Sequence, residues 1–336
     1  MAKYFRVLSI DGGGIRGIIP GQILVTVEDK LRKKTGDRNT KIGDYFDLIA
    51  GTSTGGILTC LYLCPGEKNA KKPKFNAEQA VELYLERGDE IFDISLWQKI
   101  TSVGGIVDEK YSADELESAL KDYFKDLKLS KLIKPCLIPS YDIKRREAHF
   151  FNQMNAIAND KDNFLIRDVA RATSAAPTYF EVARIMSDAN IPYPLIDGGV
   201  FANNPALCAY AEVRKKFKTT AKDMVVLSLG TGHIKHNKSY SYKEAKDWGK
   251  AEWILPLIDI MMSGVSDTVD YQLHMIFDSV GKTNQYLRIN EQLIHAGPEM
   301  DNVSSENLNA LRQDGTESAQ KFDKQLDAIV NLITKQ

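Results

Sequence analysis

The amino-acid sequence predicts an α/β fold in which helices cover both faces of a mostly parallel central sheet. Short apolar segments alternate along the chain with segments of helical character. The apolar segments have few polar residues at alternate positions, which is typical of strands that are buried on both faces. Glycine-rich turns follow the first two of these segments, where each strand is expected to lead into a helix.

The expected elements follow one another in a regular order. The first strand covers 5–10 and leads through a glycine-rich turn into a helix that extends to about residue 34. A second strand at 47–50 leads through another glycine turn into a buried helix at 56–63. Later strands are expected at 134–140, 194–196 and 224–229, and later helices at 77–87, 113–120, 205–217 and 316–334. Two polar stretches are expected to be loops, 65–74 and 233–246.

We expect one domain over residues 1–336, with a mainly helical portion from about residue 240. Of the 336 residues, 43% are hydrophobic and 26% are charged, and the formal net charge is -1. A charge this close to zero gives no general reason to expect a nucleic-acid partner. No apolar run of about 18 residues and no signal segment is visible, so a cytoplasmic protein is expected. The four cysteines form no metal-binding pattern and are expected to be buried, reduced thiols.

The strongest chemical motif is a GxSxG sequence, Gly51-Thr52-Ser53-Thr54-Gly55, between an apolar strand and a helix. A serine on such a sharp turn is forced out at the edge of the sheet, and the glycines beside it relieve crowding. The helix that follows directs its free N–H groups and the positive end of its dipole toward the serine. We therefore interpret Ser53 as a nucleophile, with a plain glycine-rich turn as the alternative.

The glycine loop after the first strand, Asp11-Gly12-Gly13-Gly14-Ile15-Arg16-Gly17, allows three interpretations. It fits the dinucleotide pattern GxGxxG, but no acidic residue ends a second strand roughly 20 residues later, as that motif requires. It also fits the phosphate loop of actin-like sugar kinases. In the third interpretation its N–H groups form an oxyanion hole, and only this one gives Ser53 a purpose. Arg16 then supports the loop or stabilises charge, with a solvated arginine as the alternative.

Asp197 is the candidate base for Ser53. It ends an apolar strand and precedes two glycines, at a strand end where ligands of α/β sheets gather. A turn-forming Asp-Gly is the alternative. A histidine is the usual third member of such a site, and among five histidines only His233, which follows a strand, is suitably placed for that role.

Five motifs together resemble the patatin-like phospholipase family, and the plant patatins in particular. They lie, in family order, at residues 7–20, 44–47 with 51–56, 173–180, 197–200 and 227–232. The resemblance extends over nearly the whole chain. It implies the three-layer patatin-like fold.

The resemblance implies a catalytic dyad that needs no histidine. Ser53 matches the nucleophile of the family and Asp197 matches its general base. The residues that match the oxyanion hole are Gly12, Gly13 and Gly14, with Arg16 helping to hold the loop. The implied activity is that of a lipid acyl hydrolase of the phospholipase A type, with no metal and no cofactor. Its substrate would be a phospholipid or another acyl lipid, with peripheral contact to a membrane.

Two features depart from the plant patatins. Those proteins are secretory or vacuolar, whereas no signal segment is visible here, and residues 201–205 are closer to microbial and animal members. An acyltransferase with the same dyad, or a binding or storage protein with weak esterase activity, is the alternative function. A nucleotide-dependent enzyme is disfavoured because a P-loop lysine and a ribose-binding acid are missing.

Two apolar segments are candidates for a lid, an acyl-chain tunnel or a membrane-contacting surface. They are residues 92–107, which include Trp97, and residues 253–262, which begin with Trp253. Ordinary packing of core helices is the alternative for both.

Overall fold

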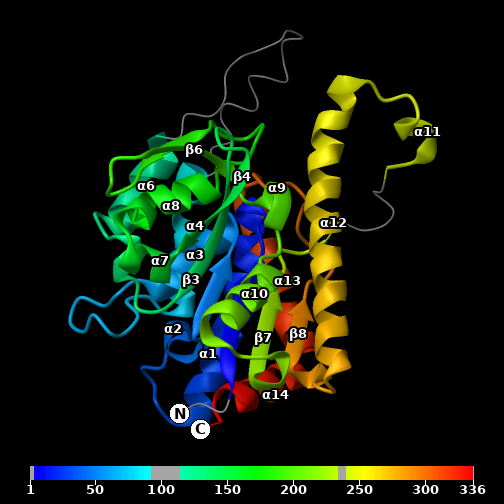
Figure 1. Cartoon of the computed structure of the whole chain (residues 1–336). Coiled ribbons are helices and arrows are strands. Elements are labelled where there is room, and N and C mark those ends of the chain that lie inside the picture. Colours follow the sequence, from blue (N-terminus) through cyan, green and yellow to red (C-terminus); the bar gives the residue numbers. More distant parts are fainter. Residues whose placement is uncertain (1–3, 92–113, 234–239, 336) are drawn as a thin grey trace.

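A computed structural model describes residues 4–91, 114–233 and 240–335 (Figure 1). The strands in these residues are β1 (Phe5–Ile10), β2 (Leu48–Gly51), β3 (Cys136–Asp142), β4 (Glu147–Asn152), β5 (Ala183–Met186), β6 (Pro192–Asp197), β7 (Met224–Leu229) and β8 (Tyr286–Ile289). They form one sheet of order β5-β6-β3-β2-β1-β7-β8, and β4 is added to it by pairing with β3. The run from β3 to β8 is parallel, whereas β4 and β6 are antiparallel to β3, and β5 is antiparallel to β6.

Helices cover both faces of this sheet. The α-helices in the described residues are α1 (Ile18–Thr35), α2 (Ile42–Tyr45), α3 (Thr54–Leu63), α4 (Ala77–Ile91), α6 (Asp114–Phe124), α7 (Gln153–Ala158), α8 (Ile166–Thr173), α9 (Gly199–Ala202), α10 (Ala206–Phe217), α11 (Tyr242–Ala245), α12 (Lys250–Ser279), α13 (Ser305–Lys321) and α14 (Asp323–Ile333). Leu8 and Leu227 pack in a core with residues of α1 and α3, whereas Val7 and Val226 pack in a second core with residues of α10 and α12. Successive strand residues therefore face two separate apolar layers, which explains why these strands are apolar throughout.

The predicted α/β fold with a mostly parallel sheet is confirmed, and three strands were not predicted. β4 begins with the charged, exposed Glu147, β5 alternates between buried and exposed residues, and β8 contains Arg288. Such strands lack the continuous apolar run that marks a central strand. The single helix expected at 316–334 is two helices, α13 and α14, which meet at Phe322. The apolar segment 92–107 lies outside the described residues.

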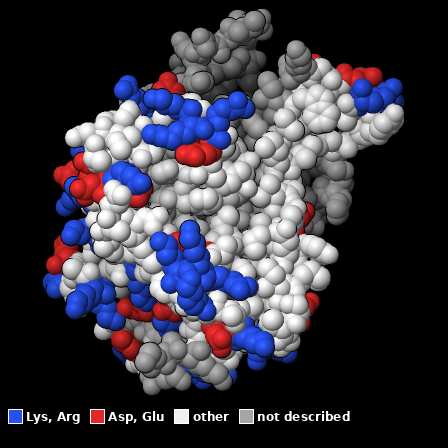
Figure 2. All heavy atoms as spheres, in the orientation of Figure 1, with Lys and Arg blue, Asp and Glu red and all other residues white. Residues whose placement is uncertain are grey.

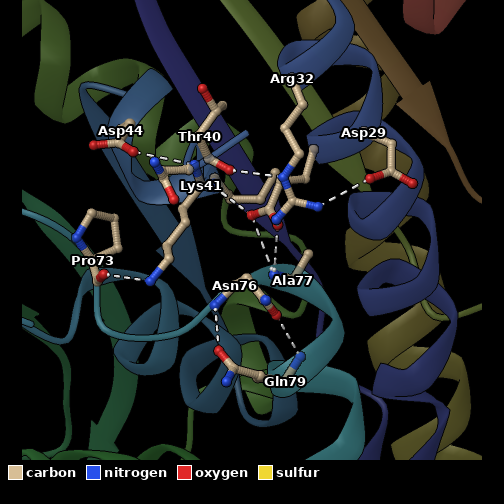
Figure 3. Close-up of polar contacts among 12 residues, drawn as sticks. Asp29, Arg32, Thr40, Lys41, Asp44, Pro73, Asn76, Ala77 and Gln79 are labelled. Carbon is tan, nitrogen blue, oxygen red and sulfur yellow. Dashed lines mark hydrogen bonds and ion pairs between the residues drawn. The ribbon is translucent and has the colours of Figure 1, made fainter. Parts of the chain in front are cut away.

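A buried carboxylate joins three of the helices on one face of the sheet (Figure 3). Glu28 of α1 accepts hydrogen bonds from the N–H of Ile42 at 2.9 Å and from the N–H of Ala77 at 3.2 Å, and it pairs with Arg32. Ile42 and Ala77 are the first residues of α2 and α4, whose N–H groups have no partner within their own helices. Glu28 therefore caps two helices, although burial raises the pKa of its carboxyl.

Candidate active site

Ser53 occupies a strained turn between β2 and α3. Its backbone has φ 54° and ψ −122°, a conformation that residues other than glycine rarely adopt. The Ser53 N–H donates to Thr173 Oγ1 at 3.0 Å, and its carbonyl accepts from the N–H groups of Gly56 and Ile57 at 2.8 and 3.1 Å. Strain that the surroundings hold in this way is concentrated at functional sites. The predicted strand, turn and helix around this serine are confirmed.

Asp197 reaches the same edge of the sheet from the opposite direction. β3 pairs with β2 at Cys136 and Leu137 and then continues beyond it, where it pairs with antiparallel β6. Asp197 lies opposite Ser140 in this pairing. β6 therefore runs back toward the carboxyl edge of the parallel strands and ends there. Asp197 lies at the edge that the sequence predicted, although its strand is antiparallel to β3.

Ser53 and Asp197 line the same pocket. The Ser53 hydroxyl acts as a hydrogen-bond donor that lowers the pKa of the carboxyl, and the Gly199 N–H donates to Asp197 Oδ1 at 2.6 Å. Both side chains are buried, with exposed fractions of 7% and 5%. Burial raises the pKa of Asp197 to about 6, although the two hydrogen bonds oppose this shift. Such a carboxylate is charged at neutral pH and is a stronger base than an ordinary aspartate.

The glycine loop after β1 presents free N–H groups to the same site. The Gly12 N–H donates to the carbonyl of Asn203 at 3.2 Å and is therefore engaged within the protein. The N–H groups of Gly13 and Gly14 donate to no described residue, and both glycines line the pocket that contains Ser53. Thr54, the first residue of α3, lines this pocket too, and its N–H likewise has no acceptor among the described residues. Thr54 was not among the predicted site residues, although the N–H after a nucleophile is a frequent oxyanion donor.

The shape of the loop depends on close contacts around Gly13. A Cβ on this residue would lie 2.2 Å from Thr231 Oγ1, so the site has no room for a side chain. Arg16 donates from Nε to the Gly13 carbonyl at 3.4 Å. The Thr231 hydroxyl donates to the Gly12 carbonyl at 2.9 Å. These two contacts hold the carbonyls of Gly12 and Gly13. In a trans peptide the N–H points opposite to the carbonyl, so the N–H groups of Gly13 and Gly14 are directed away from these contacts.

A buried ion pair between Asp11 and Arg288, which the sequence did not reveal, holds the start of the glycine loop in place. Arg288 of β8 donates to both oxygens of Asp11, at 2.8 and 2.6 Å, and the two side chains are 7% and 3% exposed. Ser266 of α12 lies 3.4 Å from the same carboxylate and donates to it. Burial raises the pKa of Asp11 although Arg288 opposes the shift. Because Arg288 is distant in the sequence and has no motif around it, only the structure shows this pairing.

An apolar pocket opens beside Ser53 and Asp197. Its apolar lining consists of Ala176, Pro177, Phe180, Val200, Ile258, Met261, Met262 and Met300. Three of these residues belong to α12 and come from the segment 253–262, which the sequence marked as a candidate lid, tunnel or membrane surface. That segment therefore lines the pocket instead of packing only into the core.

The histidines lie apart from this contact. None of the four described ones, His149, His233, His274 and His295, is bonded to Ser53 or Asp197, and His236 lies outside the described residues. His233 Nδ1 lies 3.0 Å from the carbonyl of Asn290 and borders a different, polar cavity. His149 packs against the rings of Phe151 and Tyr193, and burial lowers its pKa to about 4.

The chain is similar in sequence to a known protein family and to several of its members. A family model described as patatin-like phospholipase matches residues 8–210. The chain is 35% identical to patatin-like protein 2 of Oryza sativa subsp. indica, with 92% of this chain and 82% of that protein aligned. It is 33% identical to patatin group J-1 of Solanum tuberosum, over 94% of this chain and 84% of that protein. The crystal structure of VipD from Legionella pneumophila aligns with a TM-score of 0.46 and 10% identity, over 97% of this chain and 67% of that one.

Proposed function

The chain belongs to the patatin-like phospholipase family, and from this membership we propose that it hydrolyses fatty acyl esters of lipids, as a phospholipase of the A type. The observation that carries the proposal is the hydrogen bond from Ser53 to a buried Asp197 at the wall of an apolar pocket. Ser53 is the proposed nucleophile and Asp197 the proposed general base. The proposal needs no histidine and no metal ion.

In the first step Asp197 accepts the proton of the Ser53 hydroxyl while Ser53 Oγ attacks the ester carbonyl. The pKa of about 6 suits this task, because the carboxylate is unprotonated at neutral pH yet basic enough to assist the attack. The proton then passes to the leaving alcohol, which is a lysophospholipid when the substrate is a phospholipid, and the acyl group stays on Ser53. Water hydrolyses this intermediate in the second step.

The negative oxygen of the tetrahedral intermediate needs donors that are in place beforehand. The N–H groups of Gly13, Gly14 and Thr54 meet this need, because they border the pocket and have no acceptor among the described residues. Each such donor contributes about 3 to 4 kcal/mol to transition-state stabilisation. Gly12 is not a proposed donor, because its N–H is bonded to the Asn203 carbonyl; it helps to hold the loop in position. Arg16 supports the loop through the Gly13 carbonyl.

The pocket and its rim suit an acyl chain delivered from a lipid surface. Beside the pocket, the first half of α12 exposes the large apolar side chains Trp253, Leu257, Ile260 and Met261, each 40–46% exposed. Figure 2 shows that the α12 side of this face is largely uncharged, whereas Lys and Arg side chains gather over other elements. In the described part of the chain no helix combines the length and hydropathy needed to cross a bilayer. We therefore propose peripheral contact through this rim.

The test compares hydrolysis of a short p-nitrophenyl ester and of phosphatidylcholine vesicles by the wild type, Ser53→Ala and Ser279→Ala. Ser279 is an exposed serine at the end of α12 and serves as the matched control. Both reactions should disappear in Ser53→Ala and persist in Ser279→Ala. Hydrolysis by a folded Ser53→Ala protein at the wild-type rate would refute the proposed nucleophile. Hydrolysis of the soluble ester alone would refute the phospholipid substrate.

A further inference from the structure

Asn203 lines one of two neighbouring cavities of opposite character. One is the apolar pocket beside Ser53; the other is a polar cavity on the far side of the glycine loop. The polar cavity is lined by Asn203 and by charged or hydroxyl side chains that include Asp11, Arg16, Thr231, Ser266 and Arg288. Met262 and Met300 border both cavities. A polar cavity therefore lies next to the apolar pocket that contains Ser53.

The side chain of Asn203 has a buried acceptor without a partner. Its backbone carbonyl accepts the Gly12 N–H at 3.2 Å, and its Nδ2 donates to Ser266 Oγ at 3.3 Å. The residue is 7% exposed, and its Oδ1 has no hydrogen-bond partner among the described residues. A buried acceptor usually costs free energy when it is left unpaired, so the atom needs a functional or structural explanation.

The free Oδ1 lies near both the proposed nucleophile and the proposed base. A Cβ on Gly12 would lie 2.5 Å from this oxygen and 3.2 Å from Ser53 Cβ. A Cβ on Gly199 would lie 3.3 Å from the same oxygen and 3.1 Å from Asp197 Oδ1. The absence of a side chain at Gly12 and Gly199 thus allows Asn203 Oδ1 to lie near both Ser53 and Asp197.

We propose that Asn203 Oδ1 binds the water that hydrolyses the acyl group on Ser53, and that it thereby favours hydrolysis over acyl transfer. This proposal rests on the proposed function of Ser53 and Asp197. A water molecule has two O–H groups, so it can donate one to Asp197 and the other to Asn203. An alcohol has only one O–H on its attacking oxygen, which Asp197 requires, and it leaves Asn203 Oδ1 unpaired. The asparagine therefore assists water and offers nothing to an alcohol.

Hydrolysis of the acyl-enzyme then involves Asp197 and Asn203 together. The water oxygen bonds to the acyl carbon as Asp197 takes one of its protons, and the other proton stays on the oxygen, donated to Asn203. The bond from the acyl carbon to Ser53 Oγ then breaks, and the proton on Asp197 passes to Ser53 Oγ. The products are a fatty acid and the free serine hydroxyl, and Asn203 is unchanged. In acylation the leaving alcohol has no second proton, so Asn203 makes little contribution to that step.

The experiment measures how the acyl-enzyme divides between water and an added alcohol. Wild type and Asn203→Leu, which keeps the approximate side-chain size but removes the acceptor, react with a p-nitrophenyl ester in the presence of 1-butanol. The ratio of butyl ester to free acid should rise about tenfold in Asn203→Leu, the effect of losing one hydrogen bond. The rate of the first p-nitrophenol release should change little. Asn203→Ala provides the same test if the leucine variant does not fold.

A matched control separates this role from loop positioning. Ser266→Ala removes the partner of Asn203 Nδ2 but keeps Oδ1, so its product ratio should stay near that of the wild type. If acylation and hydrolysis fall together in the Asn203 variants with an unchanged product ratio, Asn203 only positions the loop and the proposal is wrong. Failure of the proposed function would differ visibly, because the wild type itself would then release p-nitrophenol without dependence on Ser53.

Discussion

The hydroxyl of Ser53 acts as a hydrogen-bond donor to the carboxylate of Asp197 and lowers its pKa. In a triad a histidine occupies this position and supplies a pKa near neutrality. Here burial raises the pKa of Asp197 to about 6 instead. A carboxylate in an apolar environment thus acquires the basicity that an ordinary aspartate lacks, and most of the expected behaviour of the site follows from this one shift.

The pH dependence of hydrolysis should report this carboxylate. Asp197 must be unprotonated to act as a base, so kcat/KM should rise with pH and level off above a midpoint near the Asp197 pKa of about 6. Steady-state rates on a soluble ester between pH 4 and 9 measure the midpoint. A midpoint near 4, or a rate that is constant down to pH 4, would contradict the assignment of the base.

Replacement of Asp197 should remove activity and stabilise the protein. The pKa in the folded protein, about 6, lies above the 3.8 of an ordinary aspartate, so the folded state binds the proton more tightly. The resulting stability is present at low pH and is lost as the pH rises through about 6. Asp197→Asn carries no charge to bury and should exceed the wild type by up to about 3 kcal/mol at neutral pH. Urea unfolding at several pH values should show this difference growing between about pH 4 and 6 and then staying constant. A difference that shrinks over that interval would contradict the sign of the shift.

Gly13→Ala should disable the oxyanion loop. The new Cβ would lie 2.2 Å from Thr231 Oγ1, so the loop or Thr231 must move and the free N–H groups lose their positions. We expect kcat to fall by about a hundredfold or more. Gly264→Ala is the matched control, because a Cβ at that exposed position of α12 meets nothing within 4 Å. Kinetics and thermal unfolding of both variants test the prediction, and a fully active Gly13→Ala protein would show that the loop does not bind the oxyanion.

Arg288→Met should destabilise the whole fold and not only the site. It leaves the Asp11 carboxylate buried without its partner, which typically costs about 3 to 5 kcal/mol. The exposed pair of Arg312 with Glu78 offers a control, since Arg312→Met should change stability by less than about 1 kcal/mol. Denaturant unfolding measures both. Equal, small effects would mean that Asp11 is protonated in the wild type and gains little from Arg288.

Leu257→Asp should separate lipid-surface contact from chemistry. Leu257 is 46% exposed on the part of α12 that lines the pocket, and its side chain is free to enter a lipid surface. Hydrolysis of phosphatidylcholine vesicles should fall about tenfold, while hydrolysis of a soluble ester should be unaffected. Tyr271→Asp, in the second half of the same helix and 66% exposed, is the control. Equal vesicle rates in the wild type and Leu257→Asp would argue against contact through this rim.

The sequence predicted the elements around the site more accurately than the elements at the margins of the sheet. The strands β1 and β7 begin and end at the expected residues because they are central and apolar throughout. The turn at Ser53 was predicted because it depends on a local pattern, two glycines around the serine between a strand and a helix. β5 and β8 were missed because strands at the margins of a sheet are half exposed, and their residues alternate or carry charge.

The roles of the site residues stay predictions, but the structure shows which of their contacts the sequence had no means to reveal. Asp11 was visible only as the first residue of a glycine motif, whereas its partner Arg288 lies on the last strand. The engagement of Gly12 by Asn203 and the free N–H of Thr54 likewise depend on tertiary packing. Local patterns identify residue types at turns, while hydrogen-bond partners distant in the sequence need coordinates.

The most direct test of the central claim is to label the protein with a fluorophosphonate ester, which reacts with activated serines, and to map the adduct by peptide mass spectrometry. The wild type should carry one phosphonyl group on Ser53, and Asp197→Asn should react at least about a hundredfold more slowly because the base is lost. Labelling of a different serine, or equally fast labelling of Ser53 in the wild type and Asp197→Asn, would contradict a nucleophile activated by Asp197.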